Sequence, residues 1–200
     1  MKGTGLCHES GDDDSFEAQH RLRGIMEKLY TRLEMIKMFY AYNSSATAQL
    51  INSIEQLREE EITAPGCSGN GSIRETMAHL LSAQWGWFSW FDKSKSAQES
   101  ITLRLTTKDI AGEGILSQKW AGIDRQTSAC LEKLTEADVN ESWSTSLPNG
   151  FTMSLPLWQL LMHVANHGTH TRAQVIAAIR RFGYDPGSYE FFRFALDRMK

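Results

Sequence analysis

Apolar residues at helical spacing are the sequence feature that most limits the folds open to this chain. From Leu22 to Tyr40, apolar side chains recur at steps of three and four residues. Ile110, Trp120 and Ile123 belong to a second such series. This spacing places the apolar groups on one face of an α-helix. The chain is therefore expected to form amphipathic helices that pack against one another.

Capping and breaking residues divide the chain into four main helical segments. We expect these over residues 15–60, 73–91, 107–134 and 154–182. The first range holds either one bent helix or two helices, with Ser44 and Ser45 as the place for a break. Ser72 caps the second helix and Ser154 the fourth, whose first turn tolerates Pro156.

A short non-helical segment lies before the fourth helix. Between Trp143 and Met153, β-favouring residues flank Pro148-Asn149-Gly150, which is a strong turn signal. A short last helix is expected over residues 188–199. The fold prediction is an all-α, antiparallel four-helix bundle with a short β-hairpin before the long fourth helix and a short C-terminal helix. Residues 1–14 are expected to be a disordered extension, and residues 15–200 a single domain.

The net charge, the apolar runs and the cysteines of the chain limit the kinds of partner it is expected to bind. The net charge of −3 provides no basic face for nucleic acid. No apolar run approaches the roughly 20 residues needed to span a membrane, and the N-terminus lacks a signal pattern. Cys7, Cys67 and Cys130 are odd in number and widely spaced, which is typical of reduced thiols. We therefore expect a cytoplasmic protein with neither a nucleic-acid nor a membrane partner.

Histidines are the main candidates for a functional site. His163, His167 and His170 lie within eight residues of the expected fourth helix. At 100° per residue the three side chains fall within an arc of about 60° on that helix. Imidazole is the commonest zinc ligand in proteins, and bundles place metal sites between facing helices. His79 on the second helix is the candidate partner.

The surroundings of His79 are also informative. Thr76, Ala83 and Gly86 form a stripe of small residues beside it, which would let another helix approach closely. A polar ring inside a bundle needs a hydrogen-bond partner or a metal ion. Histidines that are satisfied in the core, or that lie on a solvated face, remain the alternative at this point.

Three segments of the chain read FYAYNSSATAQLINSIEQL, SIRETMAHLLSAQWGWF and HVANHGTHTRAQVIAAIRRFGYDP. Together they resemble the DinB/YfiT family of metal-binding four-helix bundles, and the resemblance runs from about Met35 to the C-terminus. It implies that His79 and His167 are metal ligands and that Arg172 matches an arginine that follows the third ligand. Thr171 occupies that third position, which is a departure from the family pattern. His163 or His170 is then the candidate for the missing nitrogen.

The resemblance also implies a range of activities. A divalent ion such as zinc, nickel or iron would activate a low-molecular-weight thiol, similar to bacillithiol or mycothiol, for transfer to a small-molecule substrate. Asn43, Gln84 and Trp87 are candidate pocket residues, and no catalytic residue is identified. One alternative is a non-catalytic metal-binding or stress-response module, in a homodimer that buries a helix face. The other is a descendant that has lost its metal.

Overall fold

A computed structural model describes residues 30–146 and 150–198, and residues 32–200 form one compact unit. The elements in chain order are α2 (Arg32–Ile54), α3 (Glu59–Ile62), α4 (Ile73–Phe91), α5 (Ala97–Ser100), the 3-10 helix η1 (Thr107–Ile110), α6 (Ile115–Lys133), α7 (Glu136–Asn140), β1 (Ser142–Ser146), β2 (Thr152–Pro156), α8 (Leu157–Arg181) and α9 (Phe191–Asp197). The predicted extension over residues 1–14 and the start of the first predicted helix lie outside the described residues.

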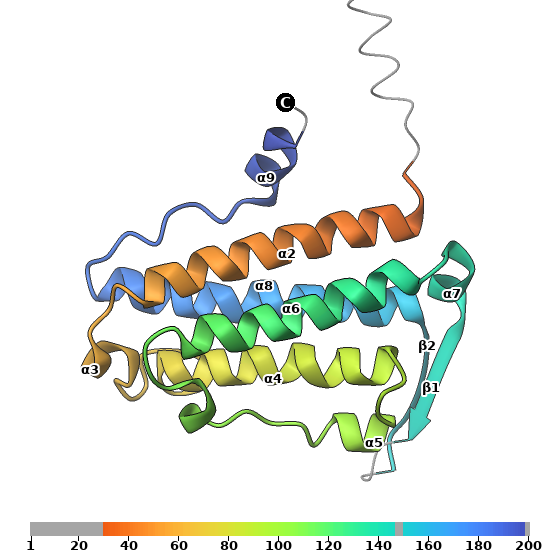
Figure 1. The fold of residues 1–200 in the computed structure, drawn as a ribbon, viewed down its shortest axis with the longest axis horizontal. Helices are drawn as coiled ribbons and strands as arrows, with labels where there is room; N and C mark the ends of the chain where they lie inside the picture. The colour runs from red at the N-terminus through yellow and green to blue at the C-terminus, as the bar shows by residue number, and fades with distance from the viewer. Residues whose placement is uncertain (1–29, 147–149, 199–200) are drawn as a thin grey trace, which may run out of the picture. The chain divides into compact units, whose positions relative to one another are not determined.

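Four long helices make the bundle (Figure 1). Helix α8 packs on α2 and α4, and α6 packs on the same two helices from the other side. Helices α2 and α8 run one way, and α4 and α6 run the other way. Helix α6 can follow α4 in the same direction because the chain after α4 returns along the bundle through α5 and η1. The predicted all-α four-helix bundle, with its hairpin and short last helix, is confirmed, and the antiparallel neighbours are α4 with α8 and α2 with α6.

The second helix begins and ends where its sequence signals predict. The Ser72 hydroxyl accepts a hydrogen bond from the Glu75 backbone N–H at 3.1 Å, and the Glu75 carboxylate accepts one from the Ser72 N–H at 2.7 Å. This reciprocal capping box satisfies two backbone donors that the first turn of a helix leaves free. It fixes the register of α4, which carries His79.

Of the two alternatives left open for the first range, the described residues support a single helix at Ser44 and Ser45, because α2 runs through both residues without interruption. The Ser44 hydroxyl donates to the Asp124 carboxylate of α6 at 2.7 Å. Its hydroxyl is therefore engaged with another helix and does not compete for the backbone of α2. The helix stops at Ile54, short of the predicted end at residue 60.

Two other predicted helix starts are wrong. Gly112 and Gly114 have φ of 97° and 69°, which is left-handed backbone that a helix does not contain, so α6 begins at Ile115. Ser154 pairs with Ser144 across the hairpin and is a strand residue, not a cap. Helix α8 begins after Pro156, whose missing N–H is no loss at that position.

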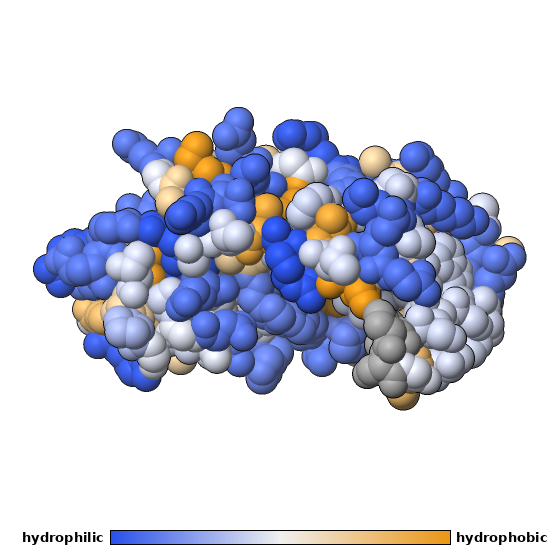
Figure 2. All heavy atoms as spheres, turned by 90° about the horizontal axis from the view of Figure 1, so that it is seen from below, coloured by the Kyte–Doolittle hydropathy of each residue, from blue (hydrophilic) through white to orange (hydrophobic). Residues whose placement is uncertain are grey.

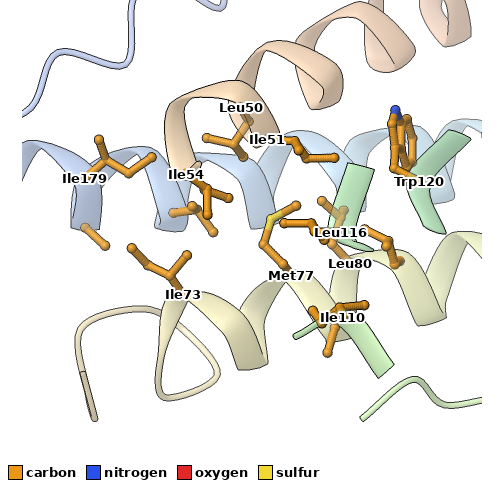
Figure 3. Close-up of a cluster of buried hydrophobic side chains, with 14 of the residues drawn as sticks. Leu50, Ile51, Ile54, Ile73, Met77, Leu80, Ile110, Leu116, Trp120 and Ile179 are labelled. Atoms are coloured by element: carbon orange, nitrogen blue, oxygen red, sulfur yellow. The ribbon is translucent and has the colours of Figure 1, made fainter. Parts of the chain in front are cut away.

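The core consists of two clusters, one toward each end of the bundle. Figure 3 shows the first, with side chains from α2, α4, η1, α6 and α8 directed at one another. Its members include Leu50, Ile54, Met77, Leu80, Trp120 and Ile179. The second cluster lies toward the hairpin and includes Ile36, Tyr40, Phe88, Phe91, Leu157 and Leu161. The middle of each long helix lies between the two clusters, and the candidate site is found there.

Candidate metal centre and adjoining pocket

Helices α4 and α8 bring His79 and His167 into direct contact. Their Nε2 atoms are 2.9 Å apart, and their ring centroids are 4.9 Å apart at an interplanar angle of 65°. His167 is half-buried and His79 is more exposed. Two of the four histidines that the sequence singled out therefore meet across the helix interface.

The other two histidines of α8 do not join this pair. The His163 ring packs edge-on against Trp87, with centroids 5.6 Å apart, and His170 Nε2 lies 3.0 Å from the Gln174 side-chain nitrogen. Although the three histidines lie on one side of α8, the side chains of His163 and His170 are directed at these other partners. In the part of the chain that the structure describes, no three His, Cys, Asp or Glu side chains converge as a metal site.

Thr171 occupies the position at which the family resemblance expects a third ligand. Its side chain is buried, and its hydroxyl donates to the His167 carbonyl oxygen at 2.9 Å. A hydroxyl bonded back to its own helix in this way is not directed at the His79–His167 pair. The donor set therefore rests on two imidazoles, with no replacement supplied at Thr171.

The two facing nitrogens fit a shared divalent ion. Nitrogen ligands at about 2.0–2.1 Å from one ion are about 2.9 Å apart at the 90° angle of square or octahedral coordination, and about 3.3–3.4 Å apart at the tetrahedral angle of zinc. The observed Nε2–Nε2 distance of 2.9 Å matches the 90° arrangement and is shorter than the tetrahedral one. It is also the length of an N–H···N hydrogen bond between two neutral imidazoles. The geometry is thus compatible with a metal-bound pair and with a metal-free pair.

Local electrostatics keep the pair neutral at pH 7. Burial, followed by the charges of His79, His163 and His170, lowers the pKa of His167 to about 4. Burial, followed by the positive charge of Arg104, lowers the pKa of His79. A neutral imidazole has a lone pair to offer, whereas an imidazolium does not. Both rings are therefore in the protonation state that metal binding requires.

A pocket of about 320 Å³ opens beside the two histidines. Its wall is formed by α4, the end of α5, the segment that follows α5, and the hairpin, and it consists of His79, Ser82, Ala83, Gly86, Trp87, Trp90, Ala97, Ser100, Ile101, Arg104, Thr145, Met153 and His167. Gly86 allows the end of α5 to approach α4, because a Cβ at this position would lie 2.7 Å from the Ser100 carbonyl oxygen. The small-residue stripe was expected to let another helix approach closely, and at Gly86 the neighbour is the last residue of the four-residue helix α5.

A hydrogen-bonded polar layer crosses the bundle between the two core clusters. We define the polar layer as Asn43, Gln84, Thr127 and Arg172, which are buried and come one from each long helix. The Asn43 amide donates to the Gln84 oxygen at 3.1 Å, and the Gln84 amide donates to the Thr127 hydroxyl at 2.9 Å. Arg172 donates to the Asn43 oxygen. The layer links α8 to α2, α4 and α6.

Comparison with known protein families gives a match over most of the chain. A sequence profile described as DinB family matches residues 27–197. The chain belongs to the DinB family. A relative in this family, Protein DinB of Bacillus subtilis strain 168, is 25% identical over 158 residues, which is 78% of this chain and 91% of that protein.

Within this DinB-family protein, sequence reasoning placed some site residues correctly and others not. Trp87 lines the pocket, as expected. Asn43 and Gln84 were expected to line it too, but they are buried in the polar layer. Sequence reasoning missed Ser100 and Arg104, which follow α4 in a segment without helical periodicity. A polar residue on an apolar helix face, such as Thr127, was the signal that could have revealed the polar layer.

No described helix of this DinB-family protein is long and apolar enough to cross a lipid bilayer. The expected cytoplasmic location, the homodimer and the lack of a nucleic-acid partner stay predictions, as does the division into residues 1–14 and 15–200.

Proposed function

We propose that this DinB-family protein binds one divalent metal ion through Nε2 of His79 and His167. The observation that carries the proposal is the 2.9 Å separation of two neutral imidazole nitrogens from different helices. Imidazole ligands suit zinc, nickel and iron alike, so the donors do not select one of these ions. His163 or His170 would supply a third nitrogen after a side-chain rotation, because both are exposed on α8 within one turn of His167.

Metal content measured by inductively coupled plasma mass spectrometry tests this proposal. We expect about one equivalent in the wild type after incubation with zinc, nickel or ferrous iron. The His79→Ala, His167→Ala double variant should bind none. Single His163→Ala and His170→Ala variants form a matched pair, and the variant that loses metal identifies the third ligand. A wild-type protein that stays empty with all three ions would refute the proposal.

The enzymatic part of the proposal is thiol S-transfer to a small electrophile. A divalent ion with an open coordination position lowers the pKa of a bound thiol and so supplies a nucleophile at neutral pH. The chain itself would contribute the histidine pair that holds the ion and an apolar pocket that keeps the electrophile beside it. Trp87 and Trp90 would exclude water from the reacting end.

A panel of thiols, bacillithiol and mycothiol included, assayed with electrophilic substrates tests this part. We expect turnover that depends on added metal and disappears in the His79→Ala, His167→Ala variant. Equal turnover in that variant, or none with any thiol in metal-loaded wild type, would contradict S-transfer while leaving metal binding to its own test.

The second candidate is a metal-free protein in which His79 and His167 are joined by a direct hydrogen bond. Two observations favour it: the 2.9 Å distance is also that of an N–H···N bond, and the Thr171 hydroxyl is engaged with the His167 carbonyl. In that case a chelator should leave the melting temperature unchanged. If an ion is bound, removing it should lower the melting temperature, because binding stabilises the folded state.

A further inference from the structure

The walls of the pocket beside the histidine pair are largely apolar. Trp87 and Trp90 of α4 lie on one side, and Ile101 and Met153 belong to the segment after α5 and to the hairpin. Figure 2 shows the face that carries α4 and α5, where hydrophobic atoms gather between strongly hydrophilic groups. The volume of about 320 Å³ is at the lower end of the range for small-molecule sites, which is roughly 300–1,000 Å³. The pocket is therefore suited to a bicyclic or branched hydrocarbon body.

Arg104 in this wall has no ion-pair partner, and Ser100 has no hydrogen-bond partner, among the described residues. The Arg104 guanidinium donates a local hydrogen bond, to the adjacent Leu103 carbonyl oxygen at 2.7 Å. The Ser100 side chain is 3% exposed, and its hydroxyl has no hydrogen-bond partner in the described part of the chain. An unpaired buried hydroxyl destabilises a protein, so Ser100 marks a strained place in the pocket wall.

We propose that this pocket binds a small organic anion, an apolar bicyclic or branched body whose carboxylate or sulfonate pairs with Arg104. The inference rests on the proposed function only in that the same pocket would hold the transferase substrate. The anionic group lies at the histidine end, because Arg104 lines the same pocket as His79 and is close enough for its charge to act on that ring. The hydrocarbon body lies between the tryptophans and Met153, where it is removed from water.

Fluorescence of 8-anilinonaphthalene-1-sulfonate tests the site in protein treated with a chelator, so that the result does not depend on metal. We expect saturable binding that Arg104→Gln weakens about fivefold, the effect of losing a partly exposed ion pair of about 1 kcal/mol. Arg125→Gln is the matched control, because Arg125 is an exposed arginine of α6 that does not line the pocket. It should leave the affinity unchanged.

Variants that obstruct the pocket, and two competitors of similar shape but different charge, complete the test. Ala83→Leu and Ile101→Trp each fill part of the pocket and should weaken binding, with folding checked by circular dichroism. Competition by 2-naphthoate should exceed that by neutral 2-naphthamide in wild type, and the preference should vanish in Arg104→Gln. Equal competition in wild type, or full affinity in both obstructed variants, would overturn the inference.

The His79→Ala, His167→Ala variant separates this inference from the metal proposal. It should lose metal but still bind the sulfonate and prefer 2-naphthoate. Failure of wild type to take up metal would refute the proposed function and leave the anion pocket standing. Normal metal uptake without a preference for the anionic competitor would refute the anion pocket and leave the metal proposal standing.

Discussion

Arg172 is a buried cation that forms no ion pair in the described part of the chain. It is 2% exposed, and its guanidinium donates to the Asn43 amide oxygen and to the hydroxyls of Thr47 and Thr169. The Tyr42 ring lies 5.6 Å from its central carbon, which allows a cation–π contact. Burial lowers the pKa of Arg172, but a guanidinium keeps its charge at any ordinary pH. Neutral dipoles and one aromatic face therefore solvate this charge.

Arg172→Lys should lower the free energy of unfolding by about 2–3 kcal/mol, although it keeps the charge. A single ammonium group lacks the planar fork that reaches three oxygens on two helices, so buried acceptors would lose their donors. Urea unfolding measures the change. Arg180→Lys, at an exposed position of the same helix, is the control and should stay within about 0.5 kcal/mol of wild type. A loss of the same size in both variants would contradict this account.

The histidine pair should make stability depend on pH. The pKa of His167 is about 4 in the folded protein, below the ordinary value of 6.5. Between these values the unfolded chain binds more protons, so the free energy of unfolding falls as pH decreases from 6.5. Urea unfolding of chelator-treated protein between pH 7.5 and 5 should show this decline. His167→Gln should reduce the slope; an unchanged slope would mean that His167 is not the group responsible.

Two glycines within helices provide a test of the close contact between α4 and α5. In Gly86→Ala, the new Cβ would lie 2.7 Å from the Ser100 backbone carbonyl, so α5 must shift away from α4. We expect a destabilisation of about 1–3 kcal/mol. In Gly122→Ala on α6 the Cβ meets nothing within 4 Å, so the substitution should stabilise the protein by about 0.5–1 kcal/mol. Thermal unfolding measures both changes, and changes of the same sign would contradict this reading of the α4–α5 contact.

Helix boundaries were predictable where the chain carries a local signal that tertiary contacts do not overrule. The capping box at Ser72 and Glu75 is such a signal, and α4 begins where it predicts. Ser154 carries a similar signal, but its pairing with Ser144 across the hairpin decides its conformation. Neighbouring residues likewise left it open whether the helix breaks at Ser44, because the Ser44 hydroxyl binds Asp124, which is 80 residues away. Partners this distant cannot be inferred from a window of neighbouring residues.

The candidate site was predictable to a similar extent. Histidine spacing and the family resemblance together singled out His79 and His167, which meet in the structure. Spacing also suggested that His163 or His170 would supply a third nitrogen, but spacing does not show that Trp87 and Gln174 are the partners of these two rings. Arg104 could not be found, because it reaches the pocket from an irregular segment whose path depends on how α5 packs at Gly86.

At the scale of the whole molecule, the polar layer separates two apolar clusters, yet all four long helices run through both. We expect one cooperative unfolding transition, because no helix can leave one cluster without disturbing the other. Circular dichroism and tryptophan fluorescence should give the same urea midpoint. The Trp85→Phe, Trp120→Phe variant retains four tryptophans, all packed in the cluster toward the hairpin. A fluorescence midpoint in this variant that differs from its circular dichroism midpoint would show that the two clusters unfold separately.

The polar layer also restricts how this sequence can change over evolutionary time. Each member is hydrogen-bonded to the next. Replacing Arg172 alone therefore removes a donor from the Asn43 side-chain oxygen, and replacing Gln84 alone removes the donor to the Thr127 hydroxyl. Substitutions at these four positions should therefore occur together. Relatives that lack an arginine at position 172 should carry apolar residues at the other three positions, and an ancestor with a half-replaced layer would have been disfavoured.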